Sequence, residues 1–274
     1  MVTFAPASGI SRSGRRGSML GGMRVDAGTY ASATDKIIAW AQVGRPSYVC
    51  AANVHMLMET RDSADYRRVV NGADLVTSDG MPLVWLLRRR GFREARRVYG
   101  PDLMLTVCER AAREQVPIGL FGGTPEVLAE LTQRLTARVP GLQIACAIAP
   151  PFGQFSPEQN RRYARTLQDA GARIVFVGLG CPKQERWMAE CSPLIPAVLL
   201  GVGAAFNFHA GKVRQSPAWM QRAGLEWVFR FAMEPRRLWR RYLWHNPRFI
   251  WALAGEEWRR SRGWSGAPRL NEPT

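Results

Sequence analysis

The sequence is poor in the residues that build metal centres and disulfide frameworks. It has five cysteines and three histidines among 274 residues, and no two cysteines are spaced as C-x-x-C. An odd, scattered set of cysteines is typical of a protein of the reducing cytosol rather than of a disulfide-bonded domain. Because His55, His209 and His245 show no ligand spacing, we expect no metal site.

Long apolar runs are also missing. The best candidate, residues 193–208, is interrupted by Pro196 and Asn207 and is shorter than the ~20 residues that a membrane-spanning helix needs. The first 28 residues are rich in Ser, Gly and Arg and lack the apolar stretch of a signal peptide. The sequence therefore predicts no transmembrane helix and a flexible basic leader over residues 1–28.

Acidic residues are few. Lys and Arg number 38 against 22 Asp and Glu, which gives a formal net charge of +16. A chain with this excess is expected to meet anions, which are nucleic acid, an anionic membrane face or a phosphate-bearing substrate. Composition alone does not choose among the three.

Between residues 29 and 212 the sequence alternates helical and strand patterns. Continuously apolar strands are expected at residues 48–51, 74–77, 116–121, 142–148, 174–177 and 197–201. Helical patterns lie between them at residues 33–43, 54–60, 65–70, 82–90, 102–114, 125–138, 157–169 and 182–190. Apolar strands alternating with helices predict an α/β fold whose mostly parallel sheet is covered by helices on both faces.

Several polar and glycine residues directly follow these strands, where parallel sheets bind their ligands. Asn53 follows the first strand, and Asp79 follows the second within a Ser-Asp-Gly turn. Asp79 at this edge has the position of a general base for a substrate hydroxyl. The alternative is an ordinary turn in which Asp79 caps the next helix.

Three glycine turns open helices at the same predicted edge. They are Gly122-Gly123, the segment 178–182 that precedes Lys183 and Gln184, and the segment 201–203. Such turns let backbone amides approach a phosphate at a helix N-terminus. None completes G-x-G-x-x-G, so ordinary αβ turns and a nucleotide-dependent oxidoreductase both stay open. The sequence has neither D-x-D nor G-x-S-x-G, which disfavours a metal-bound sugar nucleotide and a serine hydrolase.

The segment 213–264 is rich in tryptophan and arginine, and residues 265–274 form a short tail. Leu238, Trp239, Tyr242 and Leu243 share one helical face. Arginines 236, 237, 240 and 241 surround that face. A Trp-rich helix flanked by arginine is typical of an anionic lipid interface. A helical hairpin packed on the main domain is the alternative, and nucleic-acid binding is disfavoured because no known motif accompanies the charge.

Six stretches, in this order, resemble one family of bacterial glycosyltransferases. The family includes wall teichoic acid N-acetylmannosaminyltransferases, enterobacterial common antigen ManNAcA transferases and exopolysaccharide glucosyltransferases of the xanthan and acetan type, and is glycosyltransferase family 26. The Pro-Lys-Gln-Glu and Gly-Leu-Glu-Trp elements are the most specific. The stretches are residues 73–82, 97–104, 120–123, 177–185, 224–230 and 234–237.

The resemblance implies a Rossmann-like catalytic domain over residues 29–212 and a membrane-engaging helical appendage over residues 213–264. It implies an inverting, metal-independent transfer from a UDP-sugar to a sugar on polyprenyl diphosphate, without a cofactor, for a bacterial surface polysaccharide. The protein would act as a peripheral protein on the cytoplasmic face of the inner membrane, with no nucleic-acid partner.

The resemblance also implies roles for single residues. The base falls on Asp79, and pocket residues fall on Asn53 and Gln184. The acceptor diphosphate would meet arginines of the appendage, and the glycine turns with Lys183 would hold phosphate oxygens. The arginines concerned are Arg236, Arg237 and Arg240.

The sequence departs from the family pattern at two places. Ala51 stands where many members have Thr, and Gln215-Ser216 stands where many have Arg-Ala. Because a hydroxyl is missing beside the expected sugar pocket, the donor sugar stays open.

Overall fold

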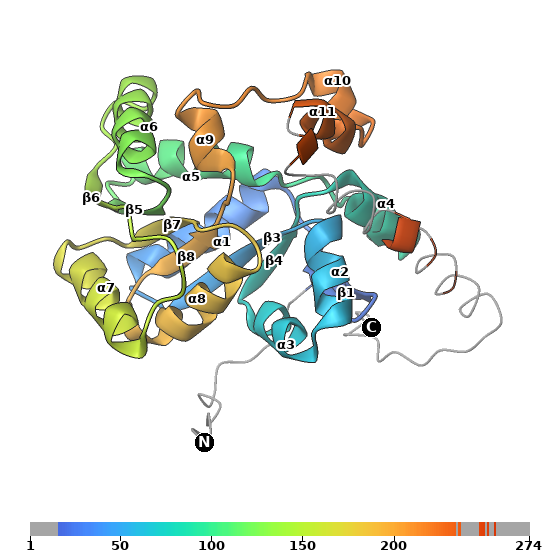
Figure 1. Cartoon of the computed structure of the whole chain (residues 1–274), viewed down its shortest axis with the longest axis horizontal. Helices are drawn as coiled ribbons and strands as arrows, with labels where there is room; N and C mark the ends of the chain where they lie inside the picture. Colours follow the sequence, from blue (N-terminus) through green and yellow to red (C-terminus); the bar gives the residue numbers. More distant parts are fainter. Residues whose placement is uncertain (1–15, 234, 237–246, 250, 252–254, 256–274) are drawn as a thin grey trace.

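A parallel sheet forms the centre of the molecule, as the sequence predicts (Figure 1). The computed structural model describes residues 16–233, 235–236, 247–249, 251 and 255. The strands are β3 (Ser47–Ala52), β4 (Leu75–Ser78), β5 (Ile118–Gly122), β6 (Ile144–Ile148), β7 (Ile174–Gly178) and β8 (Val198–Gly201). They lie in the order β4-β3-β8-β7-β5-β6, and every paired neighbour is parallel.

Helices cover both faces of this sheet because its strands are apolar on both sides. In β7, Ile174 and Phe176 belong to one core cluster, and Val175 and Val177 belong to the other. The first face is covered by α1 (Tyr30–Gln42), α5 (Gly100–Arg113), α6 (Pro125–Arg138) and α9 (Ala205–His209). The second face is covered by α2 (Val54–Asp62), α3 (Ala64–Gly72), α4 (Met81–Arg89), α7 (Pro157–Asp169) and α8 (Lys183–Cys191). A one-turn helix, η1 (Ser192–Leu194), follows α8.

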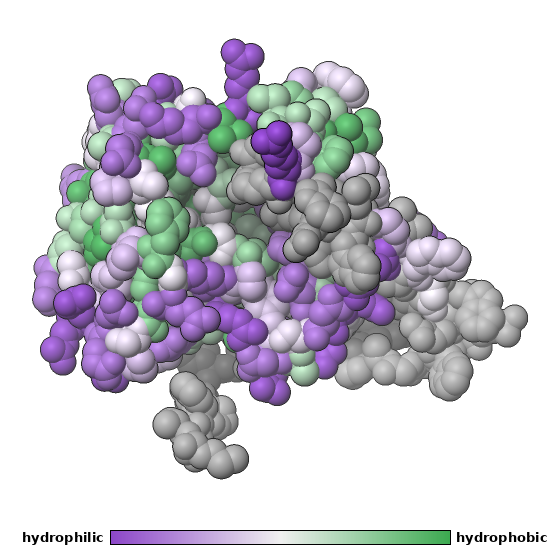
Figure 2. Space-filling view, in the orientation of Figure 1, coloured by the Kyte–Doolittle hydropathy of each residue, from purple (hydrophilic) through white to green (hydrophobic). Residues whose placement is uncertain are grey.

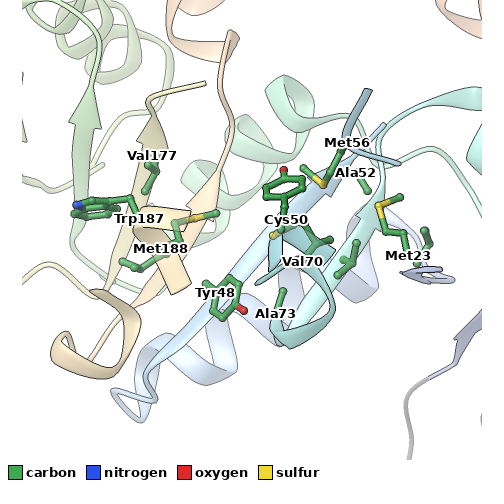
Figure 3. Close-up of a cluster of buried hydrophobic side chains, with 14 of the residues drawn as sticks. Met23, Tyr48, Cys50, Ala52, Met56, Val70, Ala73, Val177, Trp187 and Met188 are labelled. Carbon is green, nitrogen blue, oxygen red and sulfur yellow. The ribbon is translucent and has the colours of Figure 1, made fainter. Parts of the chain in front are cut away.

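The second face has an aromatic and sulfur-rich core. Trp187 of α8 stacks on Phe121 of β5 with ring centroids 4.1 Å apart, and its indole N–H donates to Asn160 at 3.1 Å. Figure 3 shows Trp187 and Met188 beside Val177 of β7, with Tyr48 and Cys50 on β3, which is separated from β7 by β8. Burial of these side chains fixes α8 against the sheet and so fixes the residues at the start of α8.

The predicted leader over residues 1–28 is wrong for residues 17–26. These residues form an antiparallel hairpin of β1 (Gly17–Leu20) and β2 (Met23–Asp26). Leu20 and Met23 are fully buried in the core on the second face of the sheet. The Asp26 carboxylate accepts a hydrogen bond from the backbone N–H of Val76 at 2.8 Å. Each strand has only four residues, which is too short for a periodic signal, so tertiary burial decides the structure here. Residues 1–15 lie outside the described residues.

Two short helices follow the main domain. They are α10 (Ala218–Arg222) and α11 (Glu226–Met233), drawn above α4 in Figure 1. Gly224, between them, lies against α4, because a Cβ there would be 3.0 Å from the Trp85 ring. Farther along, Arg248 donates to both carboxylate oxygens of Asp62 at 2.5 and 2.9 Å, and Phe249 is buried in the core cluster that contains α4. The predicted apolar face of Leu238 and its neighbours lies outside the described residues. Within the part of the chain that is described, no helix is long and apolar enough to cross a membrane.

The ends of β5 and β7 approach so closely that glycine is required between them. A Cβ on Gly122, whose φ is +123°, would lie 2.6 Å from the backbone carbon of Gly178. Gly153 has a similar φ of +115°, but a Cβ there would meet nothing within 4 Å. Substituting alanine at Gly122 and at Gly153 therefore distinguishes two contributions to stability. One is the strain of a side chain at positive φ, and the other is the overlap between β5 and β7.

We expect Gly122→Ala to lower the free energy of unfolding by about 3 kcal/mol or more, because both strain and overlap act. Gly153→Ala should cost only about 1 kcal/mol, because the strain acts alone. Urea unfolding of the two variants measures the difference. Equal losses would show that the close contact between β5 and β7 contributes nothing.

Candidate active site

A pocket of about 470 Å³ lies at the carboxyl edge of the sheet. Each strand of the sheet is followed along the chain by a residue that lines this pocket. The carboxyl edge is where parallel sheets bind their ligands. In strand order along the chain, these lining residues include Asn53, Asp79, Gly123, Pro151, Gln184 and Gly203. The structure therefore brings together five of the residues predicted from the sequence, namely Asn53, Asp79, Gly123, Lys183 and Gln184.

Asp79 lies at the end of β4, with its side chain facing the pocket and 15% exposed. Asp79 lies in the turn between β4 and α4, but it does not cap α4, because the N-cap residue is Gly80 and no side chain caps the helix. Burial raises the pKa of Asp79 to about 7. The Arg97 guanidinium opposes this rise in pKa, Glu226 adds to it, and Arg230 and the Gly100 amide oppose it. A carboxyl with a pKa near neutrality is suited to accept a proton from a hydroxyl.

Arg97 links Asp79 to the appendage. Its Nε donates to the backbone oxygen of Asp79 at 2.5 Å, and its Nη2 lies 3.6 Å from the Asp79 Oδ1. The same Nη2 donates to Glu226, the first residue of α11, and Nη1 donates to Gln221 at 3.4 Å. The guanidinium also lies over the Tyr99 ring, 4.1 Å from its centroid. Arg97 belongs to a stretch that carries the family resemblance, but sequence reasoning gave it no role in the site.

Asn53 has a defined amide orientation. Its Oδ1 accepts from the backbone N–H of Met56 at 3.2 Å and so caps α2. The Nδ2 donors are therefore the part of the side chain left for a ligand in the pocket. This placement agrees with the predicted pocket location of Asn53 and adds that it would act as a donor.

Gln184 presents the opposite group. Its Nε2 donates to Glu185 at 2.7 Å, and Glu185, which is fully buried, also accepts from the Tyr66 hydroxyl at 3.0 Å. The Gln184 side chain is 5% exposed, and its Oε1 has no hydrogen-bond partner among the described residues. A buried acceptor beside a pocket is costly unless a ligand donor meets it. Gln184 therefore places a buried acceptor without a partner, among the described residues, at the wall of the pocket.

The glycines of the predicted turns differ in whether they line the pocket or pack between strands. Gly123 lines the pocket and precedes Thr124, which caps α6. Gly122 lies in β5 against Gly178 and is not among the lining residues, so its need for glycine comes from strand packing. Lys183 lines the pocket with its Nζ 3.9 Å from the Phe155 ring centroid, and partial burial lowers the pKa of Lys183.

Two arginines that sequence reasoning did not assign also line the pocket. Arg230 of α11 lies over the Phe208 ring at 5.4 Å, and Arg214 follows α9. Of the predicted appendage arginines, Arg236 is exposed and does not line the pocket. Arg237 and Arg240 lie outside the described residues. The signal for Arg230 was its place in the family stretch 224–230, but only the packing of α11 shows that it reaches the pocket.

The histidines have other surroundings. A ring nitrogen of His209 lies 2.9 Å from the Pro101 carbonyl oxygen, and His55 lies 3.8 Å from Glu59. Among the residues that the structure describes, no three His, Cys, Asp or Glu side chains are grouped as a metal site requires.

The raised pKa of Asp79 has a consequence for stability. In the unfolded chain its pKa is 3.8, and in the folded protein it is about 7. The folded state therefore holds the proton more tightly, and ionising Asp79 between pH 4 and pH 7 destabilises it. We expect the stability of Asp79→Asn relative to wild type to rise by about 4 kcal/mol across this range and to stay constant above pH 7.

Urea unfolding of both proteins from pH 4 to pH 8 measures this difference, and carboxylates common to both cancel. A difference that does not change with pH would mean that Asp79 titrates with an ordinary pKa.

The chain matches the family model described as "Glycosyl transferase WecG/TagA/CpsF family" over residues 18–263. This match covers the hairpin, the parallel sheet, the pocket and most of the appendage. The chain therefore belongs to the WecG/TagA/CpsF family of glycosyltransferases.

Proposed function

We propose that the protein transfers a sugar from a UDP-sugar to a sugar carried on polyprenyl diphosphate, with inversion at the anomeric carbon. The observation that carries this proposal is Asp79, a pocket carboxyl whose pKa is raised to about 7. Membership of a glycosyltransferase family supplies the reaction class. The polymer to which this step contributes would be a bacterial exopolysaccharide or wall polymer.

In the proposed reaction Asp79 accepts the proton of the acceptor hydroxyl. The hydroxyl oxygen then forms a bond to the anomeric carbon as the bond from that carbon to the UDP oxygen breaks. The electron pair leaves with UDP, and the proton stays on the Asp79 carboxyl. A base with a pKa near the working pH combines a useful ionised fraction with a useful proton affinity.

The leaving diphosphate needs cations or aligned N–H groups. Lys183 and the N-terminus of α8, which has no side-chain cap, lie at the pocket, as does the N-terminus of α6 after Gly123. Arg214 and Arg230 add positive charge to the same pocket. We propose that these groups bind the donor diphosphate without a metal ion or cofactor.

The sugar would be recognised by Asn53 and Gln184, which offer a donor and an acceptor respectively. Ala51 lines the same pocket and adds no hydrogen-bonding group of its own side chain. For the acceptor, Arg236, Arg237 and Arg240 remain the proposed contacts of the lipid-linked diphosphate.

The decisive assay is release of UDP from a panel of UDP-sugars with a short-chain prenyl-diphosphate sugar acceptor, in EDTA. We expect one donor to give acceptor-dependent release, and Asp79→Asn to reduce it by about 10²–10⁴-fold because the base is removed. Asp169→Asn, a change of the same kind at an exposed site on α7, should retain wild-type activity. Full activity of Asp79→Asn would remove Asp79 as the base, and no release across the panel would contradict the transferase proposal.

The appendage also exposes large apolar side chains. Trp219, Trp227 and Met233 are 62%, 41% and 52% exposed. Figure 2 shows apolar side chains gathered over α10 and α11. We propose that this surface contacts the anionic cytoplasmic face of the inner membrane, where a polyprenyl-linked acceptor resides.

Binding to vesicles tests this surface. Trp219→Glu and Met233→Glu should each weaken co-sedimentation with phosphatidylglycerol-containing vesicles about tenfold or more. Each removes an apolar side chain that would enter the lipid interface and adds a negative charge that the anionic lipid repels. Val43→Glu introduces the same charge at an apolar side chain that is 76% exposed but lies at the end of α1. Equal weakening by all three variants would show that net charge alone governs vesicle binding.

A further inference from the structure

One guanidinium serves two carboxylates across the boundary between the catalytic domain and the appendage. Arg97 Nη2 donates to Glu226 of α11 and lies 3.6 Å from Asp79 Oδ1. The longer distance is an ion-pair distance but exceeds that of a hydrogen bond. The side chains of Arg97, Asp79 and Glu226 are each 15% exposed, so the three charges interact with little screening by water.

The guanidinium is held in this position from several sides. Its Nε is bound to the Asp79 backbone oxygen, Nη1 contacts Gln221 of α10, and the Tyr99 ring lies beneath it. Tyr99 also donates its hydroxyl to the second oxygen of Glu226 at 3.0 Å. Glu226 thus has a partner for each carboxylate oxygen, and both partners come from the segment that precedes α5.

We propose that Glu226 is a positioning residue which, by holding the Arg97 guanidinium, prevents a full ion pair with Asp79 and leaves that carboxylate able to accept the acceptor proton. The inference rests on the proposed function for its meaning in catalysis. If Glu226 has this role, Asp79 is an effective base only when α11 is packed against the segment before α5. The helix proposed to contact the membrane would then also set the ion pairing of the Asp79 carboxylate.

The charged groups that face Asp79 determine whether loss of the Glu226 charge raises or lowers the pKa of Asp79. They are Arg97, with Tyr99 beside it, from the segment before α5, and Glu226 and Arg230 from α11. With Glu226 ionised, the two positive charges are balanced by two negative ones. Without the Glu226 charge, Arg97 and Arg230 would both favour ionised Asp79, and the pKa of Asp79 would fall.

The carboxyl of Asp79 can be titrated directly in the full-length protein by ¹³C NMR with labelled aspartate, using Asp79→Asn to assign its signal. We expect Glu226→Gln to lower the pKa of Asp79 by about one unit, because it removes the charge and keeps the shape of the side chain. Glu226→Asp keeps the charge and should shift the titration less. Glu158→Gln, an equal charge change at an exposed site on α7, should not shift it.

The same variants are then compared for the pH dependence of UDP release. A lower pKa of the acidic limb together with a lower plateau rate in Glu226→Gln supports the proposal, since a role in folding alone would leave the limb in place. An unchanged Asp79 titration in Glu226→Gln, or an equal shift in Glu158→Gln, overturns it. Failure of the proposed function is recognised separately, because wild type would then release no UDP while the titration still decides the role of Glu226.

Discussion

The ion pairs of Arg97 are the constraint on which the active-site arrangement depends. They fix the turn after β4 to the segment before α5, and they fix both to the first residue of α11. Removal of a partner from such a poorly exposed cluster would leave an uncompensated charge, which is more costly than the pair itself is favourable. The cluster therefore defines where α11 lies, and α11 in turn carries Arg230 to the pocket.

Much of the fold follows from local patterns in the sequence. Strands such as residues 174–177 are apolar without interruption, and the helix at residues 125–138 begins at a Thr-Pro pair that caps it, so both are predicted within a residue or so. The hairpin at residues 17–26 is missed because its burial arises from contacts with α3, α4 and β4, which no local pattern encodes.

The residues of the candidate site likewise fall into those that local sequence predicts and those that depend on tertiary packing. Asp79, Asn53 and Gln184 are predictable because each directly follows a strand or begins the helix after it. Arg97 and Arg230 are not, because the contact of Arg97 with Glu226 and the position of Arg230 at the pocket both depend on the packing of α11 against a segment more than 120 residues away. The resemblance contained both residues, but a shared stretch of sequence does not tell which of its members face a ligand.

The glycine-rich floor of the pocket restricts where this fold can change its chemistry. Gly178 and Gly201 line the pocket, yet a Cβ on Gly178 would lie 2.6 Å from Phe206 and one on Gly201 would lie 2.7 Å from Met188. A side chain at Gly178 would overlap the Phe206 ring, and one at Gly201 would require the Met188 methyl group and the Gln184 amide to move, so this part of the pocket offers a ligand its peptide groups. Divergence in sugar preference would then arise at positions where a side chain already lines the pocket, such as Ala51 and Pro151, so the pocket has positions that are open to substitution and positions that packing restricts.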